Sequence, residues 1–236
     1  MIKLIYKFRK LIVAIFIFSI FLINYSIVIA KEPKAIRRII DGTEYELLMP
    51  GDYDKEKSYS LIIAMHGANG KIEWISDYWY SSGATDKGYF VACPQLPLYF
   101  LYDDIFSKIE AIIKDISLNY SVDIKDLYIT GFSMGAETAI YYAIANPNKV
   151  KAVAMASGQI RESILNSPVY NKNNIRKLNV LVLCGNLDDT NRFYTSVVSL
   201  LKKYKANVIS EVIEGIHDYD MTPVRKTLEY FENIRK

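Results

Sequence analysis

The residues Gly131-Phe132-Ser133-Met134-Gly135 form a pattern that can expose a nucleophilic serine. They follow the apolar run Leu127–Thr130, which is typical of a strand, and precede the Ala-rich segment Ala136–Ala145, which is typical of a helix. A sharp strand-to-helix turn strains its central residue and projects that side chain into a cleft, while the flanking glycines leave room for the backbone. An ordinary glycine-containing loop shares this pattern, but the position between strand and helix favours a nucleophile at Ser133.

A second glycine-containing segment, His66-Gly67-Ala68-Asn69-Gly70, follows the apolar run Leu61–Met65. When a serine attacks a carbonyl carbon, negative charge develops on the carbonyl oxygen, and backbone N–H groups aimed at that oxygen stabilise it. We expect the N–H groups of Ala68 and Met134 to be these donors. His66 is expected to orient the loop rather than to take part in the chemistry.

Two adjacent carboxylates, Asp188 and Asp189, follow the apolar run Val180–Cys184. A carboxylate here could accept the Nδ1 proton of a histidine and fix the tautomer of its ring. The spacing from Gly185 favours Asp188, and Asp189 is the alternative. Aspartate at such a position also commonly caps the next helix, and we expect one of the two to do so.

The chain contains two histidines, and His217 is the one that follows Ser133 in the sequence. It lies in the segment Gly215-Ile216-His217, after the strand-like run Val208–Ile213. A loop histidine without a chemical role is the alternative. The chain order Ser133, Asp188, His217 is nevertheless the order of one of the convergent catalytic triads.

Apolar runs that alternate with helical patterns predict the elements that position these residues. Ala35–Ile40 and Thr43–Met49, joined by Asp41-Gly42, predict a hairpin with a type I′ turn. The runs predicted as parallel strands are Leu61–Met65, Tyr89–Cys93, Leu127–Thr130, Val150–Ala156, Val180–Cys184 and Val208–Ile213. An α/β fold with a mostly parallel, doubly wound sheet follows, and its strands carry the candidate residues at their carboxyl ends.

Apolar residues at three- and four-residue spacing predict the helices that cross between these strands. They cover residues 105–116, 193–204 and 224–231. Asp103 or Asp104 is the expected cap of the first helix, and Thr222 followed by Pro223 is the expected start of the last.

Residues 1–30 differ in composition from the rest of the chain. A basic start without acidic residues precedes the apolar stretch Leu11–Ile23, and Val28-Ile29-Ala30 matches a cleavage site for signal peptidase. This order predicts a secretory signal peptide, with an uncleaved anchor over residues 11–30 as the alternative. Removing its four positive charges from the net charge of +3 leaves −1 for residues 31–236, so no basic block suited to nucleic acid is present. We expect residues 31–236 to form a single domain.

These motifs together give the chain a resemblance to the α/β-hydrolase superfamily. Within it, the chain resembles the secreted esterases that include polyhydroxybutyrate depolymerase-like and feruloyl or acetyl xylan esterase-like proteins. The matching segments are Thr43–Asp54, His66-Gly67, Gly131–Gly135, Pro147, Gly185–Asp188 and Gly215–His217. The resemblance implies Ser133 as nucleophile, His217 as general base and then acid, and Asp188 as orienting acid. Ala136, where many relatives have glycine, and Ala68-Asn69 depart from the family pattern, which leaves the substrate open.

The resemblance implies a secreted or extracytoplasmic serine hydrolase that cleaves carboxylic esters through an acyl-enzyme on Ser133. The ester carries a short acyl group, or a feruloyl or acetyl group on carbohydrate. A serine peptidase of the same fold and a non-catalytic binding protein on a hydrolase scaffold are the alternatives. We expect a monomer that uses no cofactor or metal. Its partner is a small-molecule or polymer-borne ester rather than nucleic acid, and a membrane only if residues 11–30 are retained.

The size of the chain and its aromatic residues bear on the substrate cleft. Only Ser157–Asn179 separates the strands between which such hydrolases often insert a lid, so we expect no large lid. Aromatic residues follow strand ends near the predicted site, and Trp79, Tyr99 and Phe100 are the candidates to line it. Packing in the core and loops is the alternative interpretation of these side chains.

The two cysteines, Cys93 and Cys184, end strands that have three others between them in the usual strand order of this fold. At about 4.8 Å per strand gap they lie roughly 19 Å apart, whereas a disulfide needs Cα atoms within about 7 Å. We therefore predict two free, buried thiols.

Overall fold

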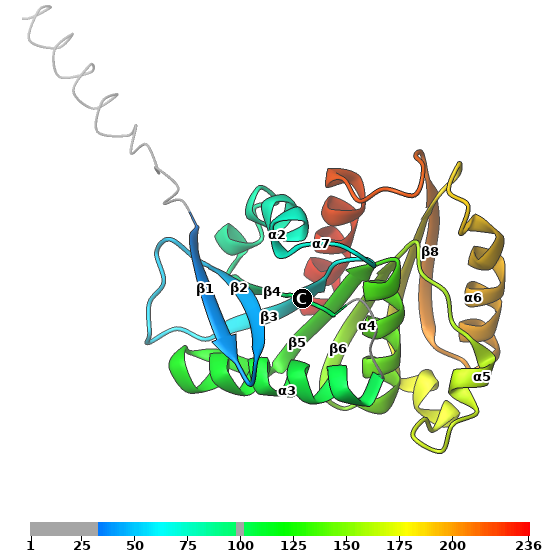
Figure 1. Ribbon diagram of the computed structural model, residues 1–236, viewed down its shortest axis with the longest axis horizontal. Coiled ribbons are helices and arrows are strands. Elements are labelled where there is room, and N and C mark those ends of the chain that lie inside the picture. Colours follow the sequence, from blue (N-terminus) through cyan, green and yellow to red (C-terminus); the bar gives the residue numbers. More distant parts are fainter. Residues whose placement is uncertain (1–32, 98–101) are drawn as a thin grey trace, which may run out of the picture. The chain divides into compact units, whose positions relative to one another are not determined.

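An eight-stranded sheet runs through residues 33–97 and 102–236, the part of the chain that the computed structural model describes (Figure 1). The strand order is β1-β2-β4-β3-β5-β6-β7-β8. The strands are β1 (Lys34–Ile40), β2 (Thr43–Met49), β3 (Tyr59–Met65), β4 (Tyr89–Pro94), β5 (Val122–Phe132), β6 (Val150–Ala156), β7 (Asn179–Gly185) and β8 (Asn207–Ile213). The six strands β3 to β8 pair in parallel with their neighbours in this order. The pairs β1 with β2 and β2 with β4 are antiparallel. The predicted fold class is confirmed.

The chain divides into two units, Met1–Lys31 and Glu32–Lys236. The predicted signal peptide, residues 1–30, lies outside the described residues. Among the described residues, no helix is both long enough and apolar enough to cross a bilayer.

The hairpin of β1 and β2 turns at Asp41 and Gly42, as the sequence predicts. Both residues have positive φ, 48° and 72°, which is the requirement of a type I′ turn. Ile40 pairs with Thr43, so the register starts directly at the turn.

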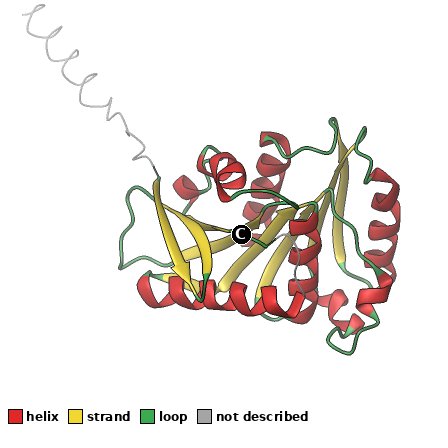
Figure 2. Ribbon diagram, viewed as in Figure 1, coloured by secondary structure: helices red, strands yellow, loops and turns green. Residues whose placement is uncertain are grey.

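The central strands are buried on both faces because each contains a run of consecutive apolar residues, such as Leu61–Met65 of β3. In β3, Leu61 and Ile63 face one core, and Ile62 and Ala64 face the other. The helices are α2 (Ile72–Tyr80), α3 (Tyr102–Asn119), α4 (Met134–Ala145), α5 (Glu162–Leu165), α6 (Asn191–Lys203) and α7 (Met221–Arg235). Helices α2 and α7 cover one face, and α3, α4 and α6 cover the other (Figure 2).

Helix starts differ from the sequence predictions in two places. Asp103 and Asp104 lie inside the first turn of α3 rather than ahead of it. Helix α7 begins at Met221 because the Asp220 carboxylate accepts a hydrogen bond from the Thr222 N–H, so the predicted cap at Thr222 is wrong. Asp220 competes better for this position because its side chain reaches the free N–H groups of the first turn.

Helix α2 was not among the predicted helices, and it corrects the prediction for Trp79. Ile72, Ile75 and Trp79 share its buried face. The Trp79 side chain is fully buried in the core beneath α7, so it packs the core and does not line a cleft.

The two cysteines are free and buried, as predicted. Cys93 lies on β4 and Cys184 on β7, and β3, β5 and β6 separate them. Burial raises the pKa of both thiols, which keeps them protonated and unreactive.

The connection from β6 to β7 contains only α5 and the short 3-10 turn Lys172–Lys177. The expected absence of a large lid between these strands therefore agrees with the described chain.

The turn from β5 into α4 packs directly against the end of β3. A Cβ atom on Gly135 would lie 2.4 Å from the carbonyl oxygen of Met65 and 2.6 Å from that of His66. A Cβ atom on Gly131 would lie 2.3 Å from the carbonyl carbon of Gly135. Because all these neighbours are backbone atoms, they cannot move aside, and both positions require glycine.

We expect Gly135→Ala to lower the free energy of unfolding by about 3 kcal/mol or more, because the added methyl group overlaps fixed backbone. Gly42→Ala is the matched control. A Cβ there meets nothing within 4 Å, so the only cost is that alanine must adopt a positive φ. Its loss should be about 1 kcal/mol. Urea unfolding of both variants measures the difference, and equal losses would contradict the close packing of the turn.

Candidate active site

Ser133 stands at the turn between β5 and α4 with φ 53° and ψ −117°, a strained conformation for a residue with a side chain. Its N–H donates to the carbonyl oxygen of Ala156 at 2.8 Å, which holds the turn against the end of β6. The residue is partly exposed. The local sequence therefore places the hydroxyl at the carboxyl edge of the sheet, where the strand ends converge.

His217 reaches Ser133 from the loop between β8 and α7. Its Nε2 lies 3.1 Å from Ser133 Oγ, and about a third of its side chain is exposed. The two residues are 84 positions apart in the sequence. The separation of His217 Nε2 and Ser133 Oγ is within the range of a hydrogen bond between a nucleophile and its base.

Asp188 contacts the other nitrogen of the same ring. His217 Nδ1 lies 3.0 Å from both carboxylate oxygens of Asp188, whose side chain is completely buried. Asp189, the alternative acid, is exposed. Neither aspartate is the N-cap of α6, because that helix follows Thr190. The structure thus joins Ser133, His217 and Asp188, the three residues predicted from the sequence, in one chain of hydrogen bonds.

The buried Asp188 carboxylate accepts further hydrogen bonds that keep it charged. Thr190 donates its N–H and its hydroxyl at 2.6 Å each, and the Ser157 hydroxyl donates as well. Burial alone raises the pKa of Asp188, but the hydrogen bonds from Ser157, Thr190 and His217 outweigh burial and hold the pKa below its ordinary value. A charged Asp188 requires the proton of a neutral His217 ring to sit on Nδ1, which leaves Nε2 free to accept from Ser133.

The loops that carry Asp188 and His217 are tied to each other. Asn186 Oδ1 accepts from the Gly215 N–H at 3.1 Å, and the Leu187 N–H donates to the Gly215 carbonyl at 2.9 Å. A Cβ on Gly185 would lie 2.4 Å from that same carbonyl oxygen. The contact fixes the acid and the histidine relative to each other across the end of the sheet.

His66 is buried beneath the loop that follows β3, in agreement with its expected role in orienting that loop. Its Nδ1 lies 2.7 Å from the Gly67 carbonyl oxygen, and its Nε2 accepts from the Leu96 N–H at 3.0 Å. Burial lowers the pKa of His66, so the ring is neutral. Gln95 adds a bond from its side-chain amide to the Gly70 carbonyl at 3.1 Å.

The two segments that carry the expected oxyanion donors both lie next to Ser133. Met134 is the first residue of α4, where N–H groups have no partner within the helix. Ala68 follows Gly67, whose Cβ would lie 3.3 Å from the Cβ of Ser133. The loop after β3 and the start of α4 therefore both lie beside the serine, and the role of the two N–H groups stays a prediction.

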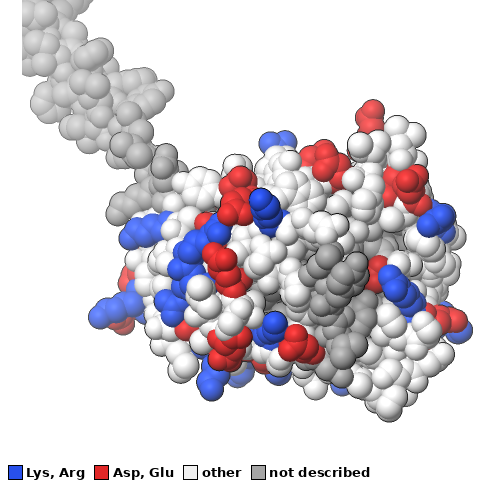
Figure 3. Space-filling view, in the orientation of Figure 1, with Lys and Arg blue, Asp and Glu red and all other residues white. Residues whose placement is uncertain are grey.

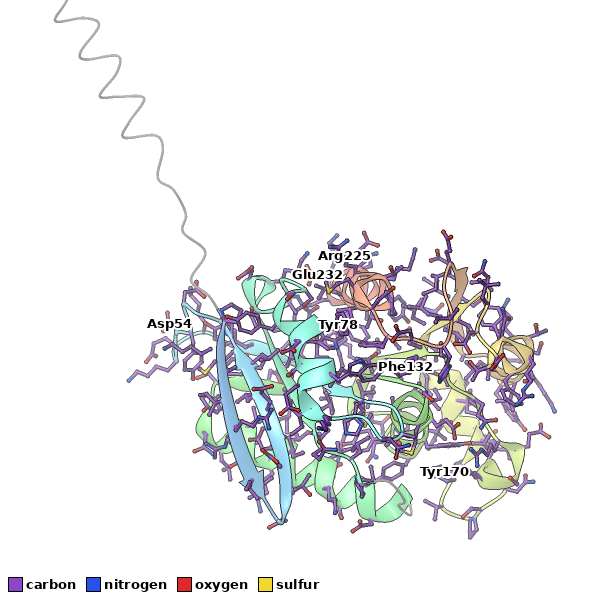
Figure 4. The ribbon with its side chains drawn as sticks, turned by 45° about the horizontal axis from the view of Figure 1, so that its top comes forward. Asp54, Tyr78, Phe132, Tyr170, Arg225 and Glu232 are labelled. Carbon is purple, nitrogen blue, oxygen red and sulfur yellow. The ribbon has the colours of Figure 1, made fainter. Side chains whose placement is uncertain are left out.

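Aromatic rings pack around His217 on one side. The Phe132 ring lies 4.7 Å from the imidazole between centroids, and it also contacts Trp74 at 5.5 Å and Tyr219 at 5.5 Å. Figure 4, in which the top of the molecule comes forward, labels Phe132 and Tyr78 of α2. Tyr78 in turn contacts Tyr219 at 6.0 Å. Trp74, rather than Trp79, is the tryptophan near the site.

Two other candidates for lining the site, Tyr99 and Phe100, lie outside the described residues. The sequence predictions missed Ser157 and Thr190 as supports of Asp188. Ser157 lies after a different strand, β6, whereas Thr190 lies only two residues after Asp188 but has no pattern that marks it as a support. The one feature of the sequence that could have pointed to Ser157 is its place directly after the predicted strand Val150–Ala156. In the described chain, no three or more His, Cys, Asp or Glu side chains gather as a metal-binding group.

On the face shown in Figure 3, Lys and Arg side chains are interspersed with Asp and Glu, so neither sign dominates.

The chain is similar to known esterases in sequence and in structure. The sequence profile of the phospholipase/carboxylesterase family matches residues 101–232, more than half of the chain. A probable feruloyl esterase C from Aspergillus terreus is 29% identical over 130 residues, which are 51% of this chain and 48% of the relative. The chain thus spans about half the length of the curated relatives that it matches.

Solved structures show the same fold at low sequence identity. A ferulic acid esterase superposes with a TM-score of 0.70 at 17% identity, covering 86% of this chain and 98% of its own. S-formylglutathione hydrolase from Staphylococcus aureus superposes with a TM-score of 0.72 at 14% identity, covering 84% and 98%. The fold, the site at the ends of its strands and the matching profile lead to one conclusion: the chain belongs to the phospholipase/carboxylesterase family of α/β-hydrolases.

Proposed function

We propose that the protein is a serine hydrolase that cleaves carboxylic esters through an acyl-enzyme on Ser133. The observation that carries the proposal is the continuous link from the Ser133 hydroxyl through His217 to a buried, charged Asp188, with contacts of 3.1 and 3.0 Å. A serine hydroxyl is a weak nucleophile on its own, and this link gives it a base in hydrogen-bond contact.

In the first half of the reaction, Ser133 Oγ attacks the ester carbonyl carbon while His217 Nε2 takes the hydroxyl proton. The negative charge that forms on the carbonyl oxygen faces the N–H groups of Ala68 and Met134. The carbon–oxygen bond to the alcohol then breaks, and His217 returns the proton to the leaving alcohol oxygen. Asp188 keeps its charge throughout and stabilises the protonated ring.

Water completes the second half of the reaction. His217 takes a proton from the water as its oxygen attacks the acyl carbon, and the proton then passes to Ser133 Oγ as the carboxylic acid leaves. Each proton moves through the same nitrogen, so one histidine serves both halves.

The acyl group is proposed from the relatives. Feruloyl esterases are among the proteins similar in sequence and in structure, which favours feruloyl, acetyl or other short acyl esters over amides. We further propose that residues 1–30 direct the protein to secretion. The proposal is supported by their basic start, the apolar stretch that follows it and the Val28-Ile29-Ala30 cleavage site.

The proposal predicts that Ser133→Ala abolishes hydrolysis of p-nitrophenyl acetate and of methyl ferulate. The variant keeps the fold, because alanine occupies the same backbone position and only the hydroxyl is removed. Release of p-nitrophenol and conversion of methyl ferulate to ferulate, followed by the change in absorbance, measure the two reactions. Turnover by the variant equal to that of the wild type would exclude Ser133 as the nucleophile.

Asp188 and its neighbour Asp189 provide a matched pair of substitutions. Asp188→Asn should lower kcat by roughly 10³-fold or more, because the asparagine amide can donate to Nδ1, so that the ring proton moves to Nε2 and this nitrogen can no longer accept from the serine. Asp189→Asn should leave kcat within about twofold of the wild type, since Asp189 is exposed and outside the hydrogen-bond chain. Steady-state kinetics on p-nitrophenyl acetate distinguish the two, and the reverse pattern would assign the acid to Asp189.

A further inference from the structure

Phe132, the residue before the serine, contacts two other parts of the site through its ring. It ends β5 and is buried, with 4% of the residue exposed. A Cβ atom on Gly67 would lie 3.1 Å from Phe132 Cδ1, so the loop that carries Ala68 packs against this ring. The imidazole of His217 contacts the ring as well. One side chain thus touches both the loop of an expected oxyanion donor and the base.

The faces of the two rings, rather than their edges, meet in the contact between Phe132 and His217. Their centroids are 4.7 Å apart, and the angle between the ring planes is 39°, which is closer to parallel than to perpendicular. A cation within about 6 Å of an aromatic centroid is attracted to the negative charge on the face of the ring. The imidazole is within this range, so the contact strengthens when the imidazole carries a positive charge.

The Phe132 ring is held against the imidazole by two further aromatic rings. Trp74 of α2 meets it edge-on, with centroids 5.5 Å apart and an interplanar angle of 67°. Tyr219, two residues after His217, also lies 5.5 Å from it. Because groups from separate segments pack on this ring, tertiary contacts fix its orientation and, with it, the plane of the imidazole.

Proton transfer changes the charge of His217 during the proposed reaction. The ring is neutral before Ser133 attacks and positively charged once Nε2 holds the hydroxyl proton. An interaction that is stronger with the charged ring stabilises the transition state more than the ground state. Asp188 acts in this way at Nδ1, whereas Phe132 acts on the face of the ring.

The charged groups around the imidazole distinguish the part of Phe132 from that of the acid. In the part of the chain that the structure describes, the Asp188 carboxylate is the charged group in hydrogen-bond contact with the ring. Asp218, the next residue along the loop, is exposed, and its carboxylate accepts from the N–H of Tyr219. Phe132 is therefore a neighbour that acts on the ring without carrying a charge.

From these contacts we infer that Phe132 is a positioning residue, which sets the plane of the His217 ring and stabilises the protonated ring during the reaction. The inference rests on the proposed function, because it assigns Phe132 a part in the proton transfer from Ser133. A side chain that only packed the core would act in the opposite direction. Its loss would admit water to the imidazole, and water favours the charged form.

The test is a proton NMR titration of the imidazole C–H signals, which needs no turnover. The chain has two histidines, and burial lowers the pKa of His66, so the signal of His66 titrates at lower pH. His217→Ala identifies the signal of His217 by its loss. The measured quantity is the pH at the midpoint of the His217 titration.

Two changes at position 132 weaken the face of the ring in different ways. Phe132→Leu removes the aromatic ring, whereas a fluorinated phenylalanine introduced at this position keeps the shape of the ring and withdraws charge from its face. We expect the midpoint of His217 to fall by about half a pH unit in both variants. The same change expressed as a rate lowers kcat for p-nitrophenyl acetate by about threefold, while KM changes little.

Phe231→Leu is the matched control for general damage to the core. Phe231 is fully buried in the apolar cluster that also contains Phe132, and its ring contacts Tyr128 and Tyr230. The same substitution there loosens the core away from the imidazole, so the midpoint should equal that of the wild type.

The outcomes distinguish this inference from the proposed function. A midpoint that is unchanged or higher in either variant at position 132 would overturn the inference, as would an equal fall in Phe231→Leu. A protein that shows the expected titration but hydrolyses neither p-nitrophenyl acetate nor methyl ferulate would overturn the proposed function instead. If leucine at position 132 disrupts the fold, the fluorinated ring decides the result, because its shape is that of phenylalanine.

Discussion

The close approach of the serine turn to the end of β3 is the contact on which the site depends. The backbone at Gly135 touches the carbonyl groups of Met65 and His66 so closely that no side chain fits between them. This contact brings the start of α4 against the loop after β3, and with it the N–H groups of Met134 and Ala68. It also holds Ser133 in a strained backbone conformation. The favourable packing of the surrounding residues offsets the energy of this strain.

The acid half of the site depends on a different balance. Burying a carboxylate is costly, and Asp188 is completely buried, yet three donors besides the histidine surround it and keep its pKa low. Two of them, the Thr190 N–H and hydroxyl, come from the same loop, and the third comes from Ser157 at the end of the neighbouring strand. The hydrogen bonds between the loops at Asn186 and Gly215 then set His217 at the correct distance from this fixed charge.

The sequence was most informative where the signal is local. The hairpin turn at Asp41-Gly42, the buried strands and the Gly-x-Ser-x-Gly turn depend on neighbouring residues, and the observed elements follow them. Which side chains are buried and which lie at the site depends on contacts between residues far apart in the sequence, and this could not be predicted. Trp74 and Trp79 share helix α2, but only the sheet and α7 determine that Trp79 is buried and Trp74 faces the site. The contact of Ser157 with Asp188 likewise joins the ends of two strands that the sequence does not place side by side, and the Asp220 cap could be recognised only once the start of α7 was known.

The central claim is that the bonded chain of Ser133, His217 and Asp188 activates one serine. Labelling with a fluorophosphonate probe, followed by mass spectrometry of the peptides, tests it most directly because only an activated serine reacts with the probe. We predict that the label is found on Ser133 in the wild type and that His217→Ala reacts far more slowly. A wild-type protein labelled at another residue, or a His217→Ala variant labelled at Ser133 as fast as the wild type, would contradict the claim.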